Sequence, residues 1–550
     1  MSYIGADFVA DALASLGIEH AFAIVSIHNM PLLDAINRLG KTKIIDVRHE
    51  QAGTHAADGY ARATGKLGVM IASTGPGTSN TVTGLYESQF GSSRVLVITG
   101  QADTTFYGKG LSYVHEAEKQ IQMLSSVCRR VESPRHISQL ADSFQAVVSD
   151  MFTGRPQPGA IEIPIDLQYA EAKKVAIELP GGNLFEADPS VISKVADKIK
   201  DASKRIFVVG GGVISSEATR ELCELAEQLD APVLTTVDGR GVLPEDHRLC
   251  MGNYYNSAGI YSAIQDADLT IAIGTKFAVG VDGQFHEQTP PGELIQIDID
   301  GNMIGRTHKA AIGVLSDAKS ALTQLKPLLT DSSQNDSQFN EALFQAREGV
   351  QTAMRARLGK DWPQVMDIIR SKLPRDGLFV RDQTISAYNW GNQQFPIYLP
   401  RTSINPTSGA IGPGFPMSIG AAIATGKKTI VIHGDGGFMF HATELATAAQ
   451  YKVPVVVCVF NDSGYGVLRW LQDNRFGRIN ETDLGKIAFA KMARSMGVPA
   501  KRVGAVDEFE EVLELAMQEE GPYLIDIDMD QFDPMEISIM PKQKREVDLD

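Results

Sequence analysis

Acidic residues follow two expected strands in the last third of the chain. The apolar run 429–432 leads into His433-Gly434-Asp435-Gly436-Gly437, and the run 454–460 leads into Asn461-Asp462-Ser463-Gly464, with a helix expected over 441–451. Open α/β sheets bind ligands at the carboxyl ends of their strands, so we expect Asp435 and Asp462 to lie together there. Two carboxylates suit a hard cation that also contacts phosphate oxygens, and Mg²⁺ fits that description.

Three glycines surround Asp435, at positions 434, 436 and 437. Glycine lets the backbone approach a bound group closely. The N–H groups that enter the following helix can face a phosphate. This segment therefore predicts a site for a metal and a phosphorylated ligand.

Glu50 stands where an expected strand (43–47) ends and an expected helix (51–63) begins. In an apolar setting the pKa of its carboxyl group would rise, and the group could exchange a proton near neutrality. The alternative is an acid that offsets the dipole at a helix N-terminus.

Three segments resemble one enzyme family. Residues 428–466 are similar to the thiamin diphosphate (ThDP) motif of the acetolactate synthase, benzoylformate decarboxylase and benzaldehyde lyase superfamily, in which GDG is followed by NN. Residues 47–65 (VRHEQAGTHAADGYARATG) resemble its glutamate segment, and residues 405–426 resemble the segment before GDG. The resemblance implies that Asp435, Asp462 and the carbonyl of Gly464 ligate Mg²⁺. Asp462 replaces the usual second Asn and keeps an oxygen ligand.

The same resemblance implies roles for further residues around the cofactor. Glu50 would hydrogen-bond the aminopyrimidine ring of ThDP and promote its activation. The carbonyl of Gly409 would bind the ring's amino group, and Ile411 would wedge between the two cofactor rings. The remaining implied cofactor contacts are Asp382, Gln383, Gly434, Gly436, Gly437, Ser463 and Tyr465.

Two histidines fall where relatives place active-site side chains. His28 lies in the loop 22–31 and His115 in YVHEAEKQ. Imidazoles there could move a proton to or from a substrate oxygen, while the alternative is that both are packing or surface histidines. The resemblance also implies a substrate cavity lined by Ile27, Ser73, Val467 and Leu471.

The reaction is less sharply indicated than the cofactor, because a pocket chooses among the outcomes that ThDP allows. We expect a ThDP- and Mg²⁺-dependent lyase or carboligase that acts on 2-hydroxy ketones, 2-hydroxyacyl compounds or aldehydes, with 2-keto acid decarboxylation also open. Val114-His115 stands where an acetolactate synthase has Phe-Gln, and CRRV at 128–131 where it has a lysine region. The alternatives are an acetolactate synthase-like condensing enzyme, a flavin-dependent pyruvate oxidase-like enzyme and a catalytically silent paralogue.

Strand and helix patterns alternate along the chain and predict three doubly wound α/β domains with mostly parallel central sheets. We expect them at 1–178, 190–330 and 342–550, separated by polar linkers at 178–190 and 330–341. In the central domain RIFVVGGG (205–212) could bind FAD or ADP, but three glycines are a weak signal and a vestigial nucleotide fold is favoured.

The bulk composition limits the kinds of partner and the compartment that we expect for this protein. A formal net charge of −16 over 550 residues argues against nucleic acid and anionic membranes as partners. Four cysteines, none in a CxxC pair, indicate a reducing compartment and no zinc site. We expect a cytoplasmic enzyme with small-molecule carbonyl substrates. The resemblance implies a homodimer or homotetramer with active sites at the subunit interface.

Overall fold

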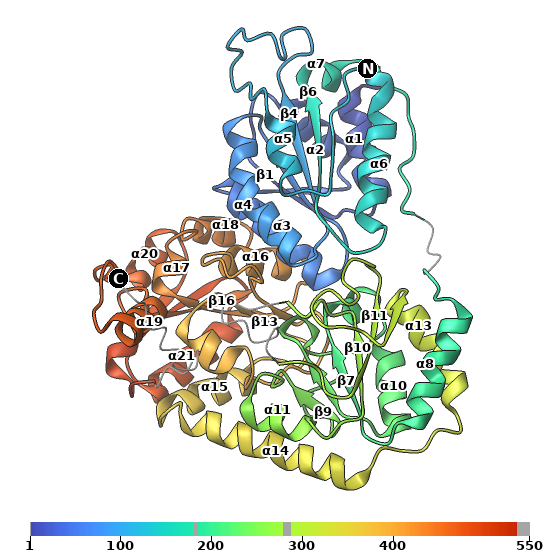
Figure 1. Ribbon diagram of the computed structural model, residues 1–550. Coiled ribbons are helices and arrows are strands. Elements are labelled where there is room, and N and C mark those ends of the chain that lie inside the picture. Colours follow the sequence, from blue (N-terminus) through green and yellow to red (C-terminus); the bar gives the residue numbers. More distant parts are fainter. Residues whose placement is uncertain (1, 181–184, 279–287, 536–550) are drawn as a thin grey trace, which may run out of the picture.

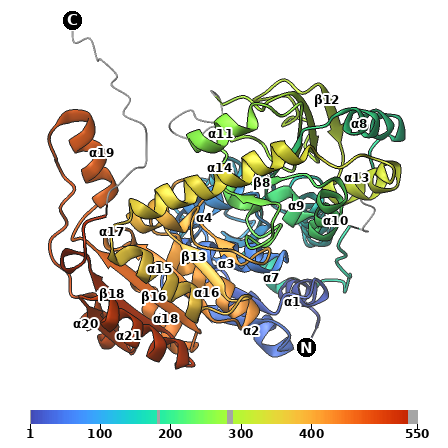
Figure 2. The same ribbon diagram turned by 90° about the horizontal axis from the view of Figure 1, so that it is seen from below.

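The computed structural model describes residues 2–180, 185–278 and 288–535 and contains three parallel β-sheets of six strands each (Figures 1 and 2). Helices cover both faces of each sheet, because short strands that are buried along their whole length need cover on both sides. The predicted fold class, three α/β domains with parallel sheets, is confirmed. The predicted domain ends stay a prediction, and part of the 178–190 linker lies outside the described residues.

The N-terminal domain carries its sheet in the order β2 (Lys43–Asp46), β1 (His20–Ala23), β3 (Gly68–Ala72), β4 (Val95–Gln101), β6 (Gly159–Pro164) and β5 (Arg130–Glu132). Its helices are α1 (Gly5–Ser15), α2 (Met30–Leu39), α3 (Glu50–Thr64), α4 (Pro76–Phe90), α5 (Gln120–Ser125), α6 (Leu140–Phe152) and α7 (Ile165–Tyr169).

The central domain has the strand order β12 (Ile312–Leu315), β11 (Glu293–Asp298), β10 (Leu269–Ile273), β7 (Arg205–Val209), β8 (Val233–Thr235) and β9 (Cys250–Gly252). Numbered within the domain this order is 6-5-4-1-2-3, the order of the Rossmann dinucleotide fold. Its helices are α8 (Pro189–Asp201), α9 (Gly211–Ser215), α10 (Thr219–Leu229), α11 (Ala258–Ile264) and α13 (Ala318–Leu325).

The C-terminal sheet repeats the order of the N-terminal one: β14 (Ser403–Ile404), β13 (Leu378–Arg381), β15 (Thr429–Gly434), β16 (Val455–Asn461), β18 (Tyr523–Asp528) and β17 (Ala500–Val503). Its helices are α15 (Asp361–Lys372), α16 (Gly414–Thr425), α17 (Asp435–Phe438), α18 (Glu444–Gln450), α19 (Gly466–Phe476), α20 (Phe489–Ser495) and α21 (Val506–Gln518).

The second predicted linker, 330–341, is partly helical and partly buried. Helix α14 (Ser337–Ala356) begins inside it, capped by the Asp336 side chain on the Phe339 N–H. Phe339 and Leu343 are buried in the hydrophobic cluster of the central domain. Polar residues in this stretch are buried because they hydrogen-bond one another, as Asn335 does to Asn340. The polarity of the segment therefore does not mean that it is exposed.

Helices α3 and α16 join the N-terminal and C-terminal domains (Figure 1). Their backbones approach so closely that a Cβ on Gly59 would lie 2.0 Å from the carbonyl oxygen of Met417. A Cβ on Gly420 would lie 1.8 Å from the carbonyl oxygen of Ala56. Only glycine permits this approach, so the two domains are fixed to each other along the two helices.

None of the helices in the described ranges is both long enough and apolar enough to cross a lipid bilayer.

Gly59→Ala should lower the free energy of unfolding by about 3 kcal/mol, since the added methyl group has no space between the two helices. Gly349→Ala is the matched control, because Gly349 lies exposed in α14 with open space around it. The control should raise stability by about 0.5–1 kcal/mol through helix propensity. Urea unfolding of both variants measures the difference, and equal effects would contradict the close packing.

Candidate active site

Asp435 and Asp462 lie together at the carboxyl edge of the C-terminal sheet. They follow β15 and β16, which pair in parallel with Gly434 opposite Phe460. Asp435 is 4% exposed, and its Oδ1 atom has no hydrogen-bond partner among the described residues. Burial, reinforced by the negative charge of Asp462, raises the pKa of Asp435 to about 7. Burial also raises the pKa of Asp462.

One guanidinium lies beside this pair. Arg469 of α19 places Nη1 3.5 Å from Oδ2 of Asp462 and donates from Nη2 to Asp483 at 2.8 Å. This one positive charge is shared between Asp462 and Asp483, and no ion pair of the described structure reaches Asp435. Two crowded carboxylates with an unpaired buried oxygen and too little positive charge are chemically suited to a divalent cation.

The glycines around Asp435 are required by neighbouring side chains of the protein itself. A Cβ on Gly436 would lie 2.6 Å from Cε1 of Tyr465, and one on Gly437 would lie 2.6 Å from Oδ2 of Asp382. Gly434 is less crowded, with Thr384 Oγ1 at 3.0 Å from its virtual Cβ. The turn after β15 is therefore tightly packed against Tyr465 and Asp382, two predicted cofactor residues.

Asp382 and Gln383, which were predicted to contact the diphosphate, hydrogen-bond backbone groups of the protein itself. Both carboxylate oxygens of Asp382 accept hydrogen bonds from the backbone N–H of Gly412, at 3.1 and 2.9 Å, and Oδ1 also accepts from Gly414 at 3.0 Å. Nε2 of Gln383 donates to the carbonyl of Pro406 at 2.6 Å. Both side chains hold the loop 405–414 in place, so a contact of either with a diphosphate stays a prediction.

Gly409 and Ile411 lie in this loop. Gly409 has φ +83°, and a Cβ there would meet no atom within 4 Å. Its backbone conformation, rather than crowding, is what favours glycine. The backbone around Gly409 therefore faces open space. The loop on either side of it is held in place by other side chains.

The nearby turn after β16 contains the remaining predicted cofactor and metal residues. Ser463 has φ +59° and its carbonyl accepts from the Leu484 N–H at 3.0 Å. Gly464 pairs with Asp483 in an antiparallel bridge, and the Tyr465 N–H donates to the carbonyl of Thr482 at 2.8 Å. The segment 482–484 therefore fixes the turn that holds Asp462.

Glu50 begins helix α3, at the carboxyl end of β2. Its Oε2 atom accepts from Asn80 Nδ2 at 2.9 Å, and its Oε1 atom lies 3.3 Å from a virtual Cβ on Gly77. Gly77 leaves room for the carboxylate at the start of α4. The side chain is only partly buried in the isolated chain.

The two predicted histidines meet above the N-terminal sheet. The rings of His28 and His115 have centroids 5.4 Å apart, although 86 residues separate them in the chain. His28 is 1% exposed, and neither ring nitrogen has a partner among the described residues. Burial, and then the charge of His115, lower the pKa of His28. The buried hydroxyl of Ser73 likewise has no described partner.

The N-terminal residues and the Asp435 group are not joined within one chain. In the described part of the structure no hydrogen bond or ion pair links Glu50, His28 or His115 to Asp435 or Asp462. The predicted pocket walls are also open: Ile27 is 60% exposed, and Val467 and Leu471 lie in α19, a helix with no buried residue. Within one chain the two groups of predicted residues therefore remain separate, and their joint role stays a prediction.

A cavity of about 550 Å³ lies between the central domain and its two neighbours. It opens at the carboxyl ends of β7 and β10, where the strand order reverses, and is lined there by Gly210–Gly212 and by Gly274 and Thr275. Asp298 at the end of β11 also lines it, and burial raises the pKa of this residue to about 6.

Three cationic side chains, Arg94, Arg155 and Lys276, line the same cavity, and we did not predict them. Arg155 comes from the N-terminal domain, and Lys276 follows β10. Burial lowers the pKa of Lys276 to about 8. No spacing in the sequence relates these residues; only the GGG run at 210–212 pointed to the cavity.

A second group of possible metal ligands lies on the central domain. Ligand atoms of Cys223, Glu227 and His247 lie within 4.8 Å of one another. Nδ1 of His247 accepts from the Leu249 N–H at 3.2 Å, so the hydrogen is on Nε2, which faces Glu227 at 3.2 Å. The contact between His247 and Glu227 is thus a hydrogen bond.

Asp435→Asn should raise the free energy of unfolding by about 2 kcal/mol at pH 8 with EDTA, because it removes one of two buried like charges. The folded-state pKa lies above the unfolded one, so this gain should vanish below about pH 4 and be complete above about pH 7. Glu87→Gln, the matched buried variant, should instead lose about 1–3 kcal/mol, since the pKa of Glu87 is lowered and its amide would face the backbone donors of Thr407 and Ser408. Urea unfolding shows the signs; a loss for both variants would contradict the repulsion.

Comparison with known proteins gives the family. Three domain families of thiamine pyrophosphate enzymes match this chain. The N-terminal TPP binding domain matches residues 4–125, the central domain matches 192–325, and the C-terminal TPP binding domain matches 385–527. One matched part lies in each of the three domains. The N-terminal match contains Glu50, the central match contains Gly210–Gly212 of the cavity lining, and the C-terminal match contains the Asp435–Asp462 pair.

Similar proteins span almost the whole chain. A probable acetolactate synthase large subunit of Methanocaldococcus jannaschii is 33% identical over 96% of this chain and 92% of its own length. An acetolactate synthase large subunit of Haemophilus influenzae is 28% identical, over 97% and 96%. A probable 2-ketoarginine decarboxylase of Pseudomonas aeruginosa is 30% identical, over 94% and 92%. The chain belongs to the thiamine pyrophosphate enzymes, in the superfamily of the acetolactate synthases and related decarboxylases.

Proposed function

We propose that this protein is a ThDP- and Mg²⁺-dependent enzyme that cleaves the bond beside the carbonyl of a 2-keto acid and joins the retained fragment to a second carbonyl compound. The observation that carries the proposal is the pair Asp435–Asp462 at the sheet edge, where the buried Asp435 has an unpaired oxygen and positive charge is in deficit. A structural ion pair would not leave two carboxylates so poorly compensated.

The residues of the chain divide the work. ThDP, when bound, supplies a nucleophilic carbon that adds to a carbonyl and accepts the electron pair of the broken bond. Asp435, Asp462 and the carbonyl of Gly464 would hold the Mg²⁺ between protein and diphosphate. Glu50 would hold a proton at the aminopyrimidine ring, and Gly409 and Ile411 would orient that ring.

His28 supports proton transfer on the substrate side. Its pKa is lowered, so the imidazole is neutral near pH 7, and both ring nitrogens are free of described partners. A neutral imidazole can donate from one nitrogen and accept at the other. His115, 5.4 Å away between ring centroids, would complete the polar side of the pocket, with Ser73 at the end of β3.

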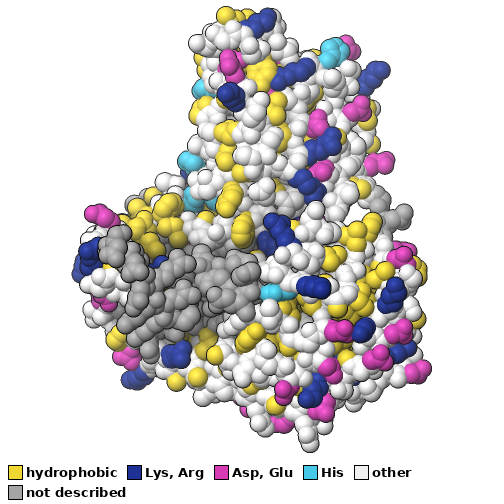
Figure 3. Space-filling view, viewed as in Figure 1, with side chains coloured by type: hydrophobic (Ala, Val, Ile, Leu, Met, Phe, Trp, Pro, Cys, Tyr) yellow, Lys and Arg dark blue, Asp and Glu magenta, His cyan; other side chains and the backbone are white. Residues whose placement is uncertain are grey.

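A homodimer, alone or within a homotetramer, would complete the site, with Glu50 of one copy facing the Asp435 group of the other. Exposed apolar side chains flank both halves: Val25, Ile27, Leu111 and Val114 on the N-terminal domain, and Met439, Phe440 and Leu468 on the C-terminal domain. Hydrophobic side chains gather where these two domains meet at the left of Figure 3. Patches of this kind mark interaction surfaces. The names of two relatives include "large subunit", which supports a further partner subunit.

The choice of reaction rests on the names of the relatives and on residues at which this sequence departs from the acetolactate synthase pattern. Acetolactate synthases and a 2-ketoarginine decarboxylase support a 2-keto acid as the donor. Val114-His115, in place of the Phe-Gln expected of an acetolactate synthase, supports a different acceptor. We therefore place the condensing reaction first and the lyase or carboligase reaction on 2-hydroxy ketones second.

Glu50→Gln should reduce turnover at least about 100-fold with saturating ThDP and Mg²⁺, because an amide cannot exchange the proton that the carboxyl group holds. The assay offers pyruvate, 2-ketoarginine, benzoylformate, benzoin, aliphatic aldehydes and 2-hydroxyacyl thioesters, and detects CO₂ and coupled products. Glu19→Gln, a surface variant of the same domain, is the control. Full activity of Glu50→Gln would refute the mechanism. Cleavage of benzoin or a thioester without 2-keto acid turnover would favour the lyase.

We further propose that the central cavity binds an adenine nucleotide such as FAD or ADP. The Rossmann strand order and the location of the cavity at the strand-order reversal support it, since such crevices are where nucleotides bind. Arg155 and Lys276 would meet the phosphates, and Asp298 is suited to a ribose hydroxyl. From the sequence alone a vestigial nucleotide fold was favoured for the central domain, and the present proposal differs from that preference.

Calorimetric titration of the purified protein with FAD and with ADP should show micromolar binding of at least one of them. Arg155→Met should weaken that binding about tenfold, because a charge-assisted phosphate contact is lost. Arg38→Met, on the same domain but paired with Asp7 and Asp34 away from the cavity, should leave it unchanged. No heat with either nucleotide, in protein freed of bound ligand, would show the cavity to be structural.

A further inference from the structure

Glu87 of the N-terminal domain holds the loop that precedes Gly409 in the C-terminal domain. Its Oε1 atom accepts from the N–H and hydroxyl of Thr407 at 2.7 and 2.9 Å, and its Oε2 atom accepts from the N–H of Ser408 at 3.1 Å and from the Ser408 hydroxyl. The Glu87 side chain is fully buried. One carboxylate from α4 thus satisfies four donors of two consecutive residues that lie 320 positions further along the chain.

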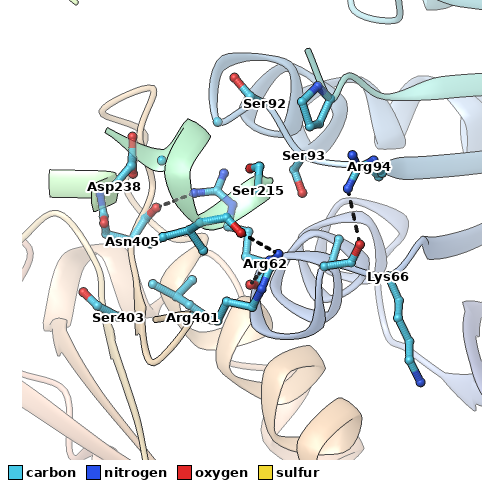
Figure 4. Close-up of a pocket in the computed structure, with 17 residues that line it drawn as sticks. Arg62, Lys66, Ser92, Ser93, Arg94, Ser215, Asp238, Arg401, Ser403 and Asn405 are labelled. Carbon is cyan, nitrogen blue, oxygen red and sulfur yellow. Dashed lines mark hydrogen bonds between the residues drawn. The ribbon is translucent and has the colours of Figure 1, made fainter. Parts of the chain in front are cut away.

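Arg62 fixes Glu87 and contacts the same loop. From the last turn of α3 it donates to Glu87 Oε1 and to Asp58, both at 2.8 Å. Its Nη1 atom donates to the carbonyl of Asn405 at 2.8 Å, as Figure 4 shows. Burial would raise the pKa of the Glu87 carboxyl, but the charge of Arg62 and the bonds from Ser408 and Thr407 outweigh it and hold the pKa below its ordinary value. Glu87 is therefore an ionised acceptor.

A second buried carboxylate holds the other end of the loop. Asp382 binds the backbone N–H groups of Gly412 and Gly414, as described above. Between the two carboxylates the chain passes through Gly409 at φ +83° and Ile411, which no side chain of the described structure pins down in the same way. The position of the Gly409 carbonyl is therefore set by what holds its two flanks.

We propose that Glu87, fixed by Arg62, is a positioning residue that sets the Gly409 carbonyl for the aminopyrimidine ring, so that the N-terminal domain of each chain shapes the cofactor loop of its own C-terminal domain. The inference rests on the proposed function. On this inference the contact of α3 and α4 with the loop has two roles. It holds the two domains together, and it contributes to cofactor binding.

The geometry makes the carboxylate hard to replace. Glutamine has one acceptor oxygen and an amide that donates, so in Glu87→Gln at least one backbone N–H of Thr407 or Ser408 would face another donor. A buried donor left without an acceptor is costly, and the loop would relieve it by moving. Gly409, next in sequence to Ser408, would move with it.

Calorimetry of the full-length, ThDP-free protein in Mg²⁺ measures the affinity for ThDP directly, without turnover. Glu87→Gln should raise Kd for ThDP about tenfold, which corresponds to about 1.4 kcal/mol. The control is Glu245→Gln, which breaks a largely buried pair with Arg240 at 2.7 Å within the central domain. Both side chains also hydrogen-bond the backbone of the C-terminal domain, away from the loop. It should leave Kd within about twofold of the unaltered chain.

A milder double variant, Thr407→Val with Ser408→Ala, removes the two hydroxyl donors to Glu87 and the acceptor of the Ala410 N–H, and leaves the carboxylate and its backbone bonds in place. It decides the question if Glu87→Gln does not fold, and it should raise Kd about threefold. Unchanged Kd in a folded Glu87→Gln or in the double variant overturns the inference, as does an equal rise in Glu245→Gln. If the unaltered chain binds no ThDP, or Glu50→Gln is fully active, the proposed function fails instead. Binding by the unaltered chain with wild-type Kd in the Glu87 variant refutes only the positioning role.

Discussion

A parallel sheet can offer side chains and helix N-termini to a ligand only at the carboxyl ends of its strands, and a crevice opens where the strand order reverses. Every candidate site in this molecule obeys that constraint. The reversal lies between β13 and β15 in the C-terminal sheet, where Asp382 and Asp435 follow the two strands. It lies between β7 and β10 in the central sheet, beneath the large cavity, and between β1 and β3 in the N-terminal sheet, beside His28 and Ser73.

The chemistry of each crevice follows from the charge that is buried there. The C-terminal crevice carries an excess of negative charge around Asp435, which a divalent cation would offset. The central cavity instead brings Arg155 and Lys276 to the strand ends with Asp298, a mixture suited to phosphates and ribose. The N-terminal crevice holds neutral groups, since burial keeps His28 uncharged. Three similar folds are thus made different by a few side chains at equivalent edges.

Buried carboxylates do two opposite things in this protein. Asp382 and Glu87 are rich in partners and act as fixed acceptors that shape the loop 405–414. Asp435 is poorer in partners, because its Oδ1 atom has none among the described residues. This contrast separates groups that hold a site from groups suited to bind a ligand, and it could not be read from residue type, because all three residues are acids.

The sequence by itself determined the fold class, the family and the local settings of Glu50, Asp435 and Asp462, because these depend on patterns within about 40 consecutive residues: apolar strands, glycine turns and helix starts. Short strands such as β14 and β17 escaped prediction, since pairing with a neighbour rather than their own apolar content makes them strands. The start of α14 inside a polar segment escaped for a related reason, as the burial of Asn335 depends on partners elsewhere.

Only the tertiary structure decided which distant residues share a site. The approach of His28 to His115, the hold of Glu87 on Thr407 and Ser408, and the meeting of Arg155 with Lys276 join residues from about 90 to more than 300 positions apart. Such contacts depend on how three sheets pack against one another, which no local pattern encodes. The Asp435–Asp462 pair could be foreseen because two adjacent parallel strands bring their ends together, whereas the hold on the loop around Gly409 required the packing of α3 against α16.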